Sequence, residues 1–345
     1  MRIILHFGMH KTGSTSIQNS FFNNAGLLEH LLYPDFGTHS HNPLLSNLYG
    51  RKAAKAPSPE IAKRKKINAK TKLKTALDTN LEKNDDILIS AEVLSAFNIK
   101  QLNKLYSLLS TYAKEIIAVG YIRSPKSYIE SAFQETLKGG NIKRLDLTKR
   151  YPNYQERIQK FDLILGQENV FLWKFNPSAF PDGCVVRDFC QRLNINLPAE
   201  SMVRVNESLS LGAVSLLYAY SKFKSKLKII DDHRKSQKLF IKNVSDYQDG
   251  KKLHFASSLI LPILEQHKLD LEWMEARLGE SLAENIYLHD DQAIASESDL
   301  LKFDPACTQW LASQLGDDYA KNWHPDMSGL QIAEWMHLLR IKANL

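Results

Sequence analysis

Residues 3–16 decide how this chain is interpreted, and they read Ile3-Ile4-Leu5-His6-Phe7-Gly8-Met9-His10-Lys11-Thr12-Gly13-Ser14-Thr15-Ser16. The run from 3 to 7 is short, apolar and β-prone, which predicts a buried strand. Residues 17–22 have apolar positions at helical spacing. The segment therefore predicts a strand, a glycine-bearing turn and a helix in direct succession.

The residue types in this turn favour the binding of an anion. Gly8 and Gly13 permit backbone angles that a Cβ would forbid, and they let the main chain approach a ligand closely. Successive N–H groups at a helix N-terminus then face one concavity, where the helix dipole favours negative charge. Lys11 adds a mobile positive charge, and the hydroxyls of residues 12 and 14–16 add donors. A βα turn without a ligand is the alternative, but it needs none of these polar groups.

The order of residues in the turn indicates which phosphate it binds. The nucleotide-triphosphatase loop places its Lys after the second Gly, whereas here Lys11 precedes Gly13. This order resembles the 5′-phosphosulfate loop of the sulfotransferases that use 3′-phosphoadenosine-5′-phosphosulfate (PAPS). The closest resemblance is to bacterial members thought to act on carbohydrates, and it covers about residues 1–195.

A second motif lies at the end of another predicted strand, over residues 116–122. Arg123 follows this strand, Pro125 opens a helix, and Ser131 lies two turns into that helix. An Arg offers a fixed fork of donors suited to a phosphate, and a Ser hydroxyl can complete the pocket. The pair resembles the 3′-phosphate motif of the same family. The alternative is a capped helix with a surface Arg.

The resemblance implies a set of donor-binding residues and a three-layer P-loop-like fold. The first motif would hold the 5′-phosphosulfate, the second the 3′-phosphate, and an aromatic ring the adenine. The residues implied for the donor are His10, Lys11, Thr12, Gly13, Ser14, Thr15, Ser16, Arg123, Ser131 and Phe175. PAPS would be the sulfuryl donor, and no metal is required.

Transfer to an acceptor hydroxyl needs a base and a cation. Lys11 is expected to neutralise the leaving-group oxygen. Glu92 directly follows a predicted buried strand, at the position where relatives carry a catalytic His or Glu, and we favour it as the base. Its alternative is a helix-capping or surface role. His39 and His41 are alternative bases, because histidine titrates in the useful range. They could also bind zinc, but the sequence offers no further ligands beside them.

Strands and helices alternate through the first part of the chain, which predicts an α/β fold with a mainly parallel central sheet and helices on both faces. Ligands of such sheets bind beyond the carboxyl ends of the strands, where all these motifs would meet. We expect a core over residues 1–205, with a basic, irregular insert at 33–84, and a mostly helical subdomain over 206–345. A short apolar run at 27–32 predicts a helix. The polar residues at 229–250 predict a connection between helices. Residues 251–278 and 328–342 suggest further helices.

The composition predicts a globular protein with an apolar core of normal size. The chain has 345 residues, of which 43% are hydrophobic, and a net charge of +7. Residues 51–74 hold ten basic side chains, Arg51, Lys52 and Lys55 among them, against Glu60 alone. The alternatives for this segment are a solvated helix face and a surface that draws an anionic acceptor or a nucleotide. No aromatic residue lies among these bases, which argues against nucleic acid.

The sequence shows no signal peptide and no apolar stretch long enough to span a membrane, so we expect a cytoplasmic protein. The expected partner is a carbohydrate or glycoconjugate acceptor that can be anionic. Two other functions stay open: a kinase-like P-loop phosphotransferase, and a nucleotide- or polyanion-binding module without catalysis. The first would need Mg²⁺ and a Lys after the second Gly.

Overall fold

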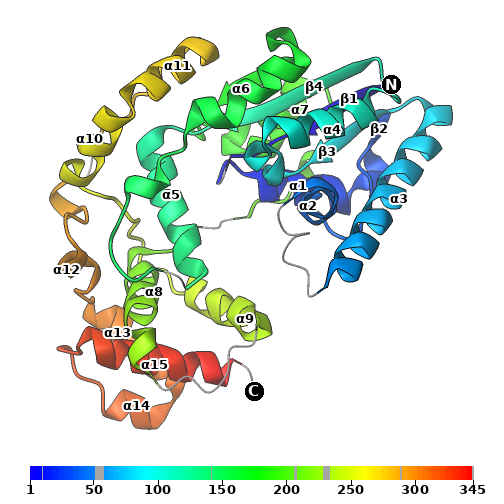
Figure 1. The fold of residues 1–345 in the computed structure, drawn as a ribbon. Helices are drawn as coiled ribbons and strands as arrows, with labels where there is room; N and C mark the ends of the chain where they lie inside the picture. Colours follow the sequence, from blue (N-terminus) through cyan, green and yellow to red (C-terminus); the bar gives the residue numbers. More distant parts are fainter. Residues whose placement is uncertain are drawn as a thin grey trace. The chain divides into compact units, whose positions relative to one another are not determined.

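A computed structural model describes residues 1–9, 11–50, 58–140, 142–205, 208–227, 234–287 and 290–343. Of the residues singled out above, His10, Arg51, Lys52 and Lys55 lie outside these ranges. Figure 1 shows the arrangement of the elements. The chain forms two compact units, one of 1–124, 153–206 and 269–282, the other of 125–152, 207–268 and 283–345.

The first unit contains one five-stranded sheet of order β2-β3-β1-β4-β5, and every pair of neighbours is parallel. The strands are β1 (Arg2–His6), β2 (Leu31–Leu32), β3 (Asp86–Ser90), β4 (Glu115–Ile122) and β5 (Val170–Lys174). β1 lies at the centre, and its register pairs His6 with Ser90 of β3 and Val119 of β4. The carboxyl ends of three strands therefore meet at one edge of the sheet, which is where the motifs follow.

Helices cover both faces of this sheet. Ile4 of β1, Leu88 of β3 and Val119 of β4 belong to an apolar cluster with residues of α1 (Ser14–Asn23) and α7 (Val185–Leu193). At the opposite face, Phe7 stacks on Phe161 of α6 (Tyr154–Leu165), with 4.2 Å between ring centroids. Strands that are buried on both faces need continuous apolar runs, which β1, β3 and β4 have. The predicted α/β class, with its parallel sheet and its helices on both faces, is confirmed.

The other helices of the first unit are α2 (Asn42–Tyr49), α3 (Pro59–Lys83), α4 (Ile99–Leu109) and most of α11 (Lys268–Leu278), and the 3₁₀ turn η3 (Glu92–Ala96) follows β3. Ser58 caps α3 as its side chain accepts from the Ile61 N–H at 3.3 Å. The long basic segment is thus mostly one helix. The expectation of an irregular segment was wrong for α2, whereas α3 begins at Ser58-Pro59-Glu60, where the sequence predicts a helix with Ser58 as its N-cap.

The second unit is helical. It contains α5 (Pro125–Lys138), α8 (Leu211–Phe223), α9 (Arg234–Ser245), α10 (Ser257–Gln266), α12 (Glu297–Leu300), α13 (Pro305–Leu315), α14 (Asp317–Lys321) and α15 (Gly329–Lys342). α8 is buried along nearly its whole length and packs against α5 and α15. Phe133 of α5 meets the ring of Phe255 edge-on, with 5.1 Å between centroids. This agrees with the helical character expected after residue 206.

Three local expectations were wrong. Residues 27–32 do not form a helix: Leu31 and Leu32 form β2, because they complete the ladder at the edge of β3. Residues 229–250 hold a helix, α9, because Phe240 and Val244 share one face and are fully buried. Residues 251–256 are not helical, although 251–278 was expected to be: α10 begins at Ser257, and α11 follows it after His267.

Candidate functional site

The turn between β1 and α1 is held by its own polar groups. Lys11 and Gly13 both have left-handed backbone angles, with φ of 62° and 75°. Thr12 Oγ1 donates to the Met9 carbonyl at 2.9 Å, so its hydroxyl proton stabilises the turn. A Cβ on Gly13 would come within 2.5 Å of Val185 Cγ1 of α7. Position 13 therefore requires glycine for both its backbone angle and its packing.

The N-terminus of α1 leaves hydrogen-bond donors unsatisfied among the described residues. No side chain caps this end, where Gly13 is the N-cap. The hydroxyl of Ser14 is buried and has no hydrogen-bond partner in the described part of the chain. It lies over Gly8, where a Cβ would approach Ser14 Oγ to 1.8 Å. The uncapped N–H groups and this buried hydroxyl leave hydrogen-bonding capacity at the positive end of the helix dipole.

The hydroxyl-bearing residues Thr15, Ser16 and Ser20 of α1 differ in their surroundings. Ser16 Oγ accepts from the Val205 N–H at 3.1 Å, and this serine is 7% exposed. Thr15 is half-buried. Ser20, one turn further, accepts from the Val203 N–H at 2.7 Å. Residues 203–205 are therefore fixed along α1, and Ser16 contributes to that attachment.

Arg123 joins the second motif to the first. Its Nη1 donates to the Lys11 carbonyl at 2.7 Å. Its guanidinium carbon lies 5.6 Å from the centroid of the Phe175 ring, just beyond β5. The Arg123 carbonyl in turn accepts from the Tyr154 hydroxyl at 2.6 Å. Residues that follow β1, β4 and β5 are thus in direct contact, and Lys11, Arg123 and Phe175 surround one region of the first unit.

Ser131, the other residue implied for the 3′-phosphate, belongs to α5 and so to the second unit. It is 7% exposed. Its pairing with Arg123 stays a proposal, as does any role of His10, which lies outside the described residues.

Glu92 lies beside the loop. It is half-buried and begins η3, two residues after β3 ends. Its Cγ is 3.4 Å from the position that a Cβ on Gly8 would take. The Glu92 carbonyl accepts from Ser95 Oγ at 2.8 Å, which closes the 3₁₀ turn on itself. The carboxylate therefore extends from a short, internally bonded turn that packs against the proposed phosphosulfate loop.

His41 is committed to the backbone. The Ser90 N–H donates to its Nδ1 at 3.1 Å, and its Nε2 lies 3.0 Å from the Pro34 carbonyl. An N–H can only donate and a carbonyl can only accept, so the ring must be the neutral tautomer with its proton on Nε2. Burial lowers its pKa to about 4. His39 is exposed, and its carbonyl accepts from the Tyr33 hydroxyl at 2.5 Å.

A buried polar group under the loop was not anticipated from the sequence. His6 is fully buried at the end of β1, and its Nδ1 lies 2.8 Å from Ser90 Oγ. Gln18 of α1 donates to the same oxygen at 3.1 Å. Burial lowers the pKa of His6 to about 3, so the ring is neutral. A histidine inside an apolar strand was the available signal, and these contacts tie β1, β3 and α1 together beneath the turn.

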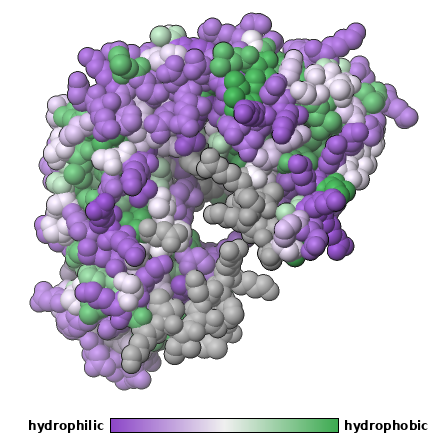
Figure 2. Space-filling model, viewed as in Figure 1, coloured by the Kyte–Doolittle hydropathy of each residue, from purple (hydrophilic) through white to green (hydrophobic). Residues whose placement is uncertain are grey.

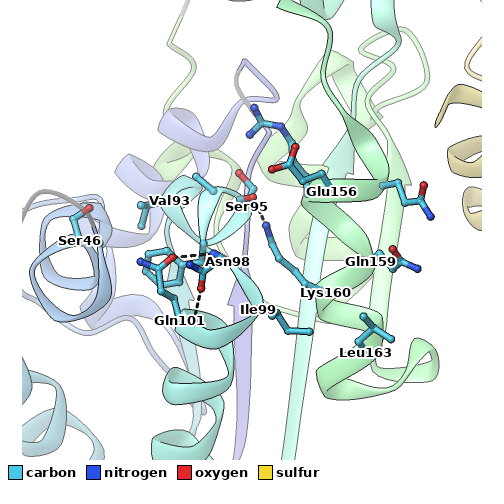
Figure 3. Close-up of a pocket in the computed structure, with 15 residues that line it drawn as sticks. Ser46, Val93, Ser95, Asn98, Ile99, Gln101, Glu156, Gln159, Lys160 and Leu163 are labelled. Atoms are coloured by element: carbon cyan, nitrogen blue, oxygen red, sulfur yellow. Dashed lines mark hydrogen bonds between the residues drawn. The ribbon is translucent and has the colours of Figure 1, made fainter. Parts of the chain in front are cut away.

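A cavity of about 680 Å³ lies on the other side of η3, between the start of α4 and α6. Figure 3 shows Lys160 reaching from α6 towards Ser95 across this space. Lys160 Nζ donates to the Ser95 carbonyl at 2.6 Å, and burial lowers its pKa to about 8. Asn98 and Gln101 close the α4 end with a reciprocal capping box. The turn that carries Glu92 is thus held from this side by a buried lysine.

The described residues contain neither a candidate metal centre nor a candidate membrane-spanning helix. No group of three or more His, Cys, Asp or Glu side chains there could hold a metal ion. No helix in the same ranges has the length and apolar character needed to cross a membrane.

Comparisons with known proteins give distant matches. No family model matches the chain. An uncharacterized protein of Archaeoglobus fulgidus is 22% identical over 132 residues, which are 38% of this chain. The match spans 36% of that curated relative's length. A solved structure, a sulfotransferase from Alicyclobacillus acidocaldarius, is 12% identical, with a TM-score of 0.35 over 65% of this chain and 94% of that one. At this TM-score the likeness carries no argument.

Proposed function

We propose that this protein is a sulfotransferase that moves the sulfuryl group of PAPS to a hydroxyl of a carbohydrate or glycoconjugate. The observation that supports this most is the hydrogen bond from Arg123 to the Lys11 carbonyl. Two motifs that are 112 residues apart in the sequence are in contact at the carboxyl edge of the sheet. Neither motif would need the other if each were only a capped helix.

The donor would be bound at both of its phosphate groups. The uncapped N–H groups of α1, the Ser14 hydroxyl and the Lys11 ammonium would receive the 5′-phosphosulfate. Thr12, Gly13, Thr15 and Ser16 would shape that turn, with His10 beside it. Arg123 would bind the 3′-phosphate, and Phe175, beside Arg123, would contact the adenine. For Ser131, a role at the 3′-phosphate is what the family resemblance implies.

The reaction would be an in-line displacement at sulfur. The acceptor oxygen forms a bond to sulfur while the bond from sulfur to the bridging oxygen of the 5′-phosphate breaks. The acceptor proton goes to the base, and the electron pair of the broken bond goes to the phosphate oxygen. The products are a sulfate ester and adenosine 3′,5′-bisphosphate. Lys11 and the N–H groups of α1 would stabilise the charge that builds on the leaving group.

Glu92 would take the acceptor proton. Its side chain packs against Gly8, at the start of the loop that would hold the reacting group. Both ring nitrogens of His41 are hydrogen-bonded to the main chain, and a base must reach the proton that it abstracts. His39, which is exposed, is the remaining alternative base.

Binding of adenosine 3′,5′-bisphosphate tests the proposal directly, by isothermal titration calorimetry. Lys11→Ala and Arg123→Ala should each weaken binding about 10- to 100-fold, since each removes a charge-assisted contact. Lys100→Ala, on the exposed surface of α4, is the matched control and should bind as the wild type does. Turnover of labelled PAPS with a panel of glycans then identifies the acceptor.

Two results would overturn the proposal. The first is wild-type protein that does not bind adenosine 3′,5′-bisphosphate. The second is a thermal shift with ATP and Mg²⁺ that exceeds the shift with PAPS, which would favour the kinase-like alternative. Binding without turnover on any acceptor, with no effect of Glu92→Gln, would favour a non-catalytic binding module.

A further inference from the structure

We propose that α3 is a docking surface for an anionic polysaccharide, which would make the acceptor of the proposed reaction a polyanionic chain. The statement that the polysaccharide is the acceptor rests on the proposed function. Binding of the polysaccharide to α3 does not depend on that function. The surface is a stripe of four exposed lysines, Lys63, Lys66, Lys70 and Lys74, which we call the lysine stripe.

The four lysines share one side of the helix. Their spacings of three, four and four residues keep them within an arc of about 80° at about 100° per residue. The stripe is about 16 Å long at a rise of about 1.5 Å per residue. It therefore presents a row of like charges along the helix axis, suited to a linear ligand that carries a negative charge on successive units.

The charge on α3 is not balanced locally. Seven basic residues lie between Lys63 and Lys74, and the sequence has no acid between Glu60 and Asp78. None of the seven forms an ion pair with an acid among the described residues. Like charges three or four residues apart destabilise a helix. A polyanion that binds here would remove this repulsion and release its own counterions.

The first part of α3 does nothing for the core. Every buried residue of this helix lies at Ala69 or beyond, so residues 59–68 bury no side chain. α3 packs against α2, and α2 also contacts η3, the turn that carries Glu92. In Figure 2, the edge where Figure 1 places α3 is mostly purple, the colour of hydrophilic residues. A helix that extends beyond its packing with one sign of charge is a surface for a partner.

Two other polyanionic partners fit less well. A membrane-binding helix needs an apolar face, but the exposed Ile61 and Ile67 lie about 120° apart around the axis at about 100° per residue. Binding of single-stranded nucleic acid uses aromatic side chains on which bases stack, and α3 has no Phe, Tyr or Trp. Charge without apolar or aromatic groups favours a hydrated, charged polysaccharide.

The test measures binding of dextran sulfate and of polygalacturonate in the absence of donor, with neutral dextran as the uncharged probe. Lys63→Gln, Lys66→Gln, Lys70→Gln and Lys74→Gln are combined in one full-length variant. The control variant combines Lys100→Gln, Lys104→Gln, Lys114→Gln and Lys321→Gln, which are also exposed and remove the same charge. Glutamine preserves helix propensity, and circular dichroism reports whether α3 remains folded.

The wild type and the control should bind both anionic polymers and not dextran. The stripe variant should bind at least about tenfold more weakly and lose most of its salt dependence, as expected when cation–anion contacts are removed. Equal losses in both variants would overturn the inference, because net charge alone would then explain binding. Tighter binding to an oligonucleotide or to anionic lipid vesicles would also overturn it. Binding of adenosine 3′,5′-bisphosphate is measured separately and should be unchanged in the stripe variant. Failure of the proposed donor site can therefore be distinguished from failure of polysaccharide binding.

Discussion

The turn that carries Glu92 and the loop of His39 and His41 both adjoin the end of β3, yet they are built differently. The His41 N–H donates to the Ser90 carbonyl at 3.0 Å, and the Ser90 N–H donates to Nδ1 of the His41 ring. Glu92 is half-buried against Gly8 of the phosphate-type turn. One residue completes the hydrogen bonding of a strand end, whereas the other extends beyond it.

The difference shows why an ordinary pKa is a poor guide to a catalytic base. A free histidine titrates near neutrality, but burial with both nitrogens bonded leaves His41 neutral and fixed. A carboxylate beside an anion-binding turn can take a proton if an acceptor hydroxyl reaches it. The four predictions below test this comparison.

The largest effect is expected for Glu92→Gln. If Glu92 takes the acceptor proton, kcat should fall about 10²- to 10⁴-fold, while the affinity for adenosine 3′,5′-bisphosphate stays within about twofold. The measurement is steady-state turnover of labelled PAPS, paired with calorimetry of the product. A wild-type rate in this variant would transfer the role of base to the histidine loop.

His41→Leu should act on stability rather than on the reaction. The substitution leaves the Ser90 N–H and the Pro34 carbonyl buried without partners, and each such group costs about 1–3 kcal/mol. We expect the free energy of unfolding in urea to fall by about 2–4 kcal/mol. His39→Leu, at an exposed position, is the control and should change it little. If His41→Leu is stable but inactive, the comparison is reversed.

The two buried histidines should make the protein less stable in acid. Burial lowers the pKa of His6 to about 3 and of His41 to about 4, from 6.5. Below pH 6.5 the unfolded chain takes up protons that the folded chain does not, so the free energy of unfolding decreases as pH falls towards 4. Each histidine contributes up to about 1.4 kcal/mol per pH unit. The free energy of unfolding in urea, measured at several pH values, should depend less steeply on pH in His41→Leu than in the wild type.

The smallest effect is expected for Lys160→Met. Loss of the bond to the Ser95 carbonyl loosens η3, and misplacement of a base lowers the rate. A fall in kcat of about tenfold is expected, without a change in donor affinity. Lys160→Arg, which can still donate to Ser95, should recover part of the rate. A loss of stability with unchanged kcat in the folded protein would make Lys160 a structural residue only.

The sheet was predictable because its strands are short apolar runs that each end in a polar motif. Ile3–Phe7 and 116–122 contain the central strands almost to the residue. β2 was not predictable: Leu31 and Leu32 are too few to show any period, and only pairing with β3 makes them a strand. The later helix α9 was obscured by a polar composition, since Phe240 and Val244 are the buried residues among its described side chains.

The candidate site was predictable in part. Residue order indicated the loop, and strand ends placed Arg123 near it. The sequence did not reveal that Arg123 would hold the loop through the Lys11 carbonyl, because a backbone acceptor leaves no mark in the residue types. It favoured Glu92 over His41 as the base, but it did not show that the ring of His41 is bonded to the main chain. That distinction depends on burial and on the carbonyl of Pro34, seven residues away.

The close approach of Ser14 Oγ to Gly8 makes these two positions interdependent. A side chain can enter at position 8 only if the one at 14 is withdrawn, and a larger group at 14 would press on the main chain of residue 8. A larger residue at position 8 alone, or at position 14 alone, should therefore be harmful, whereas a larger residue at 8 paired with a smaller one at 14 should be tolerated. Over evolutionary time, the two sites are expected to vary together or not at all.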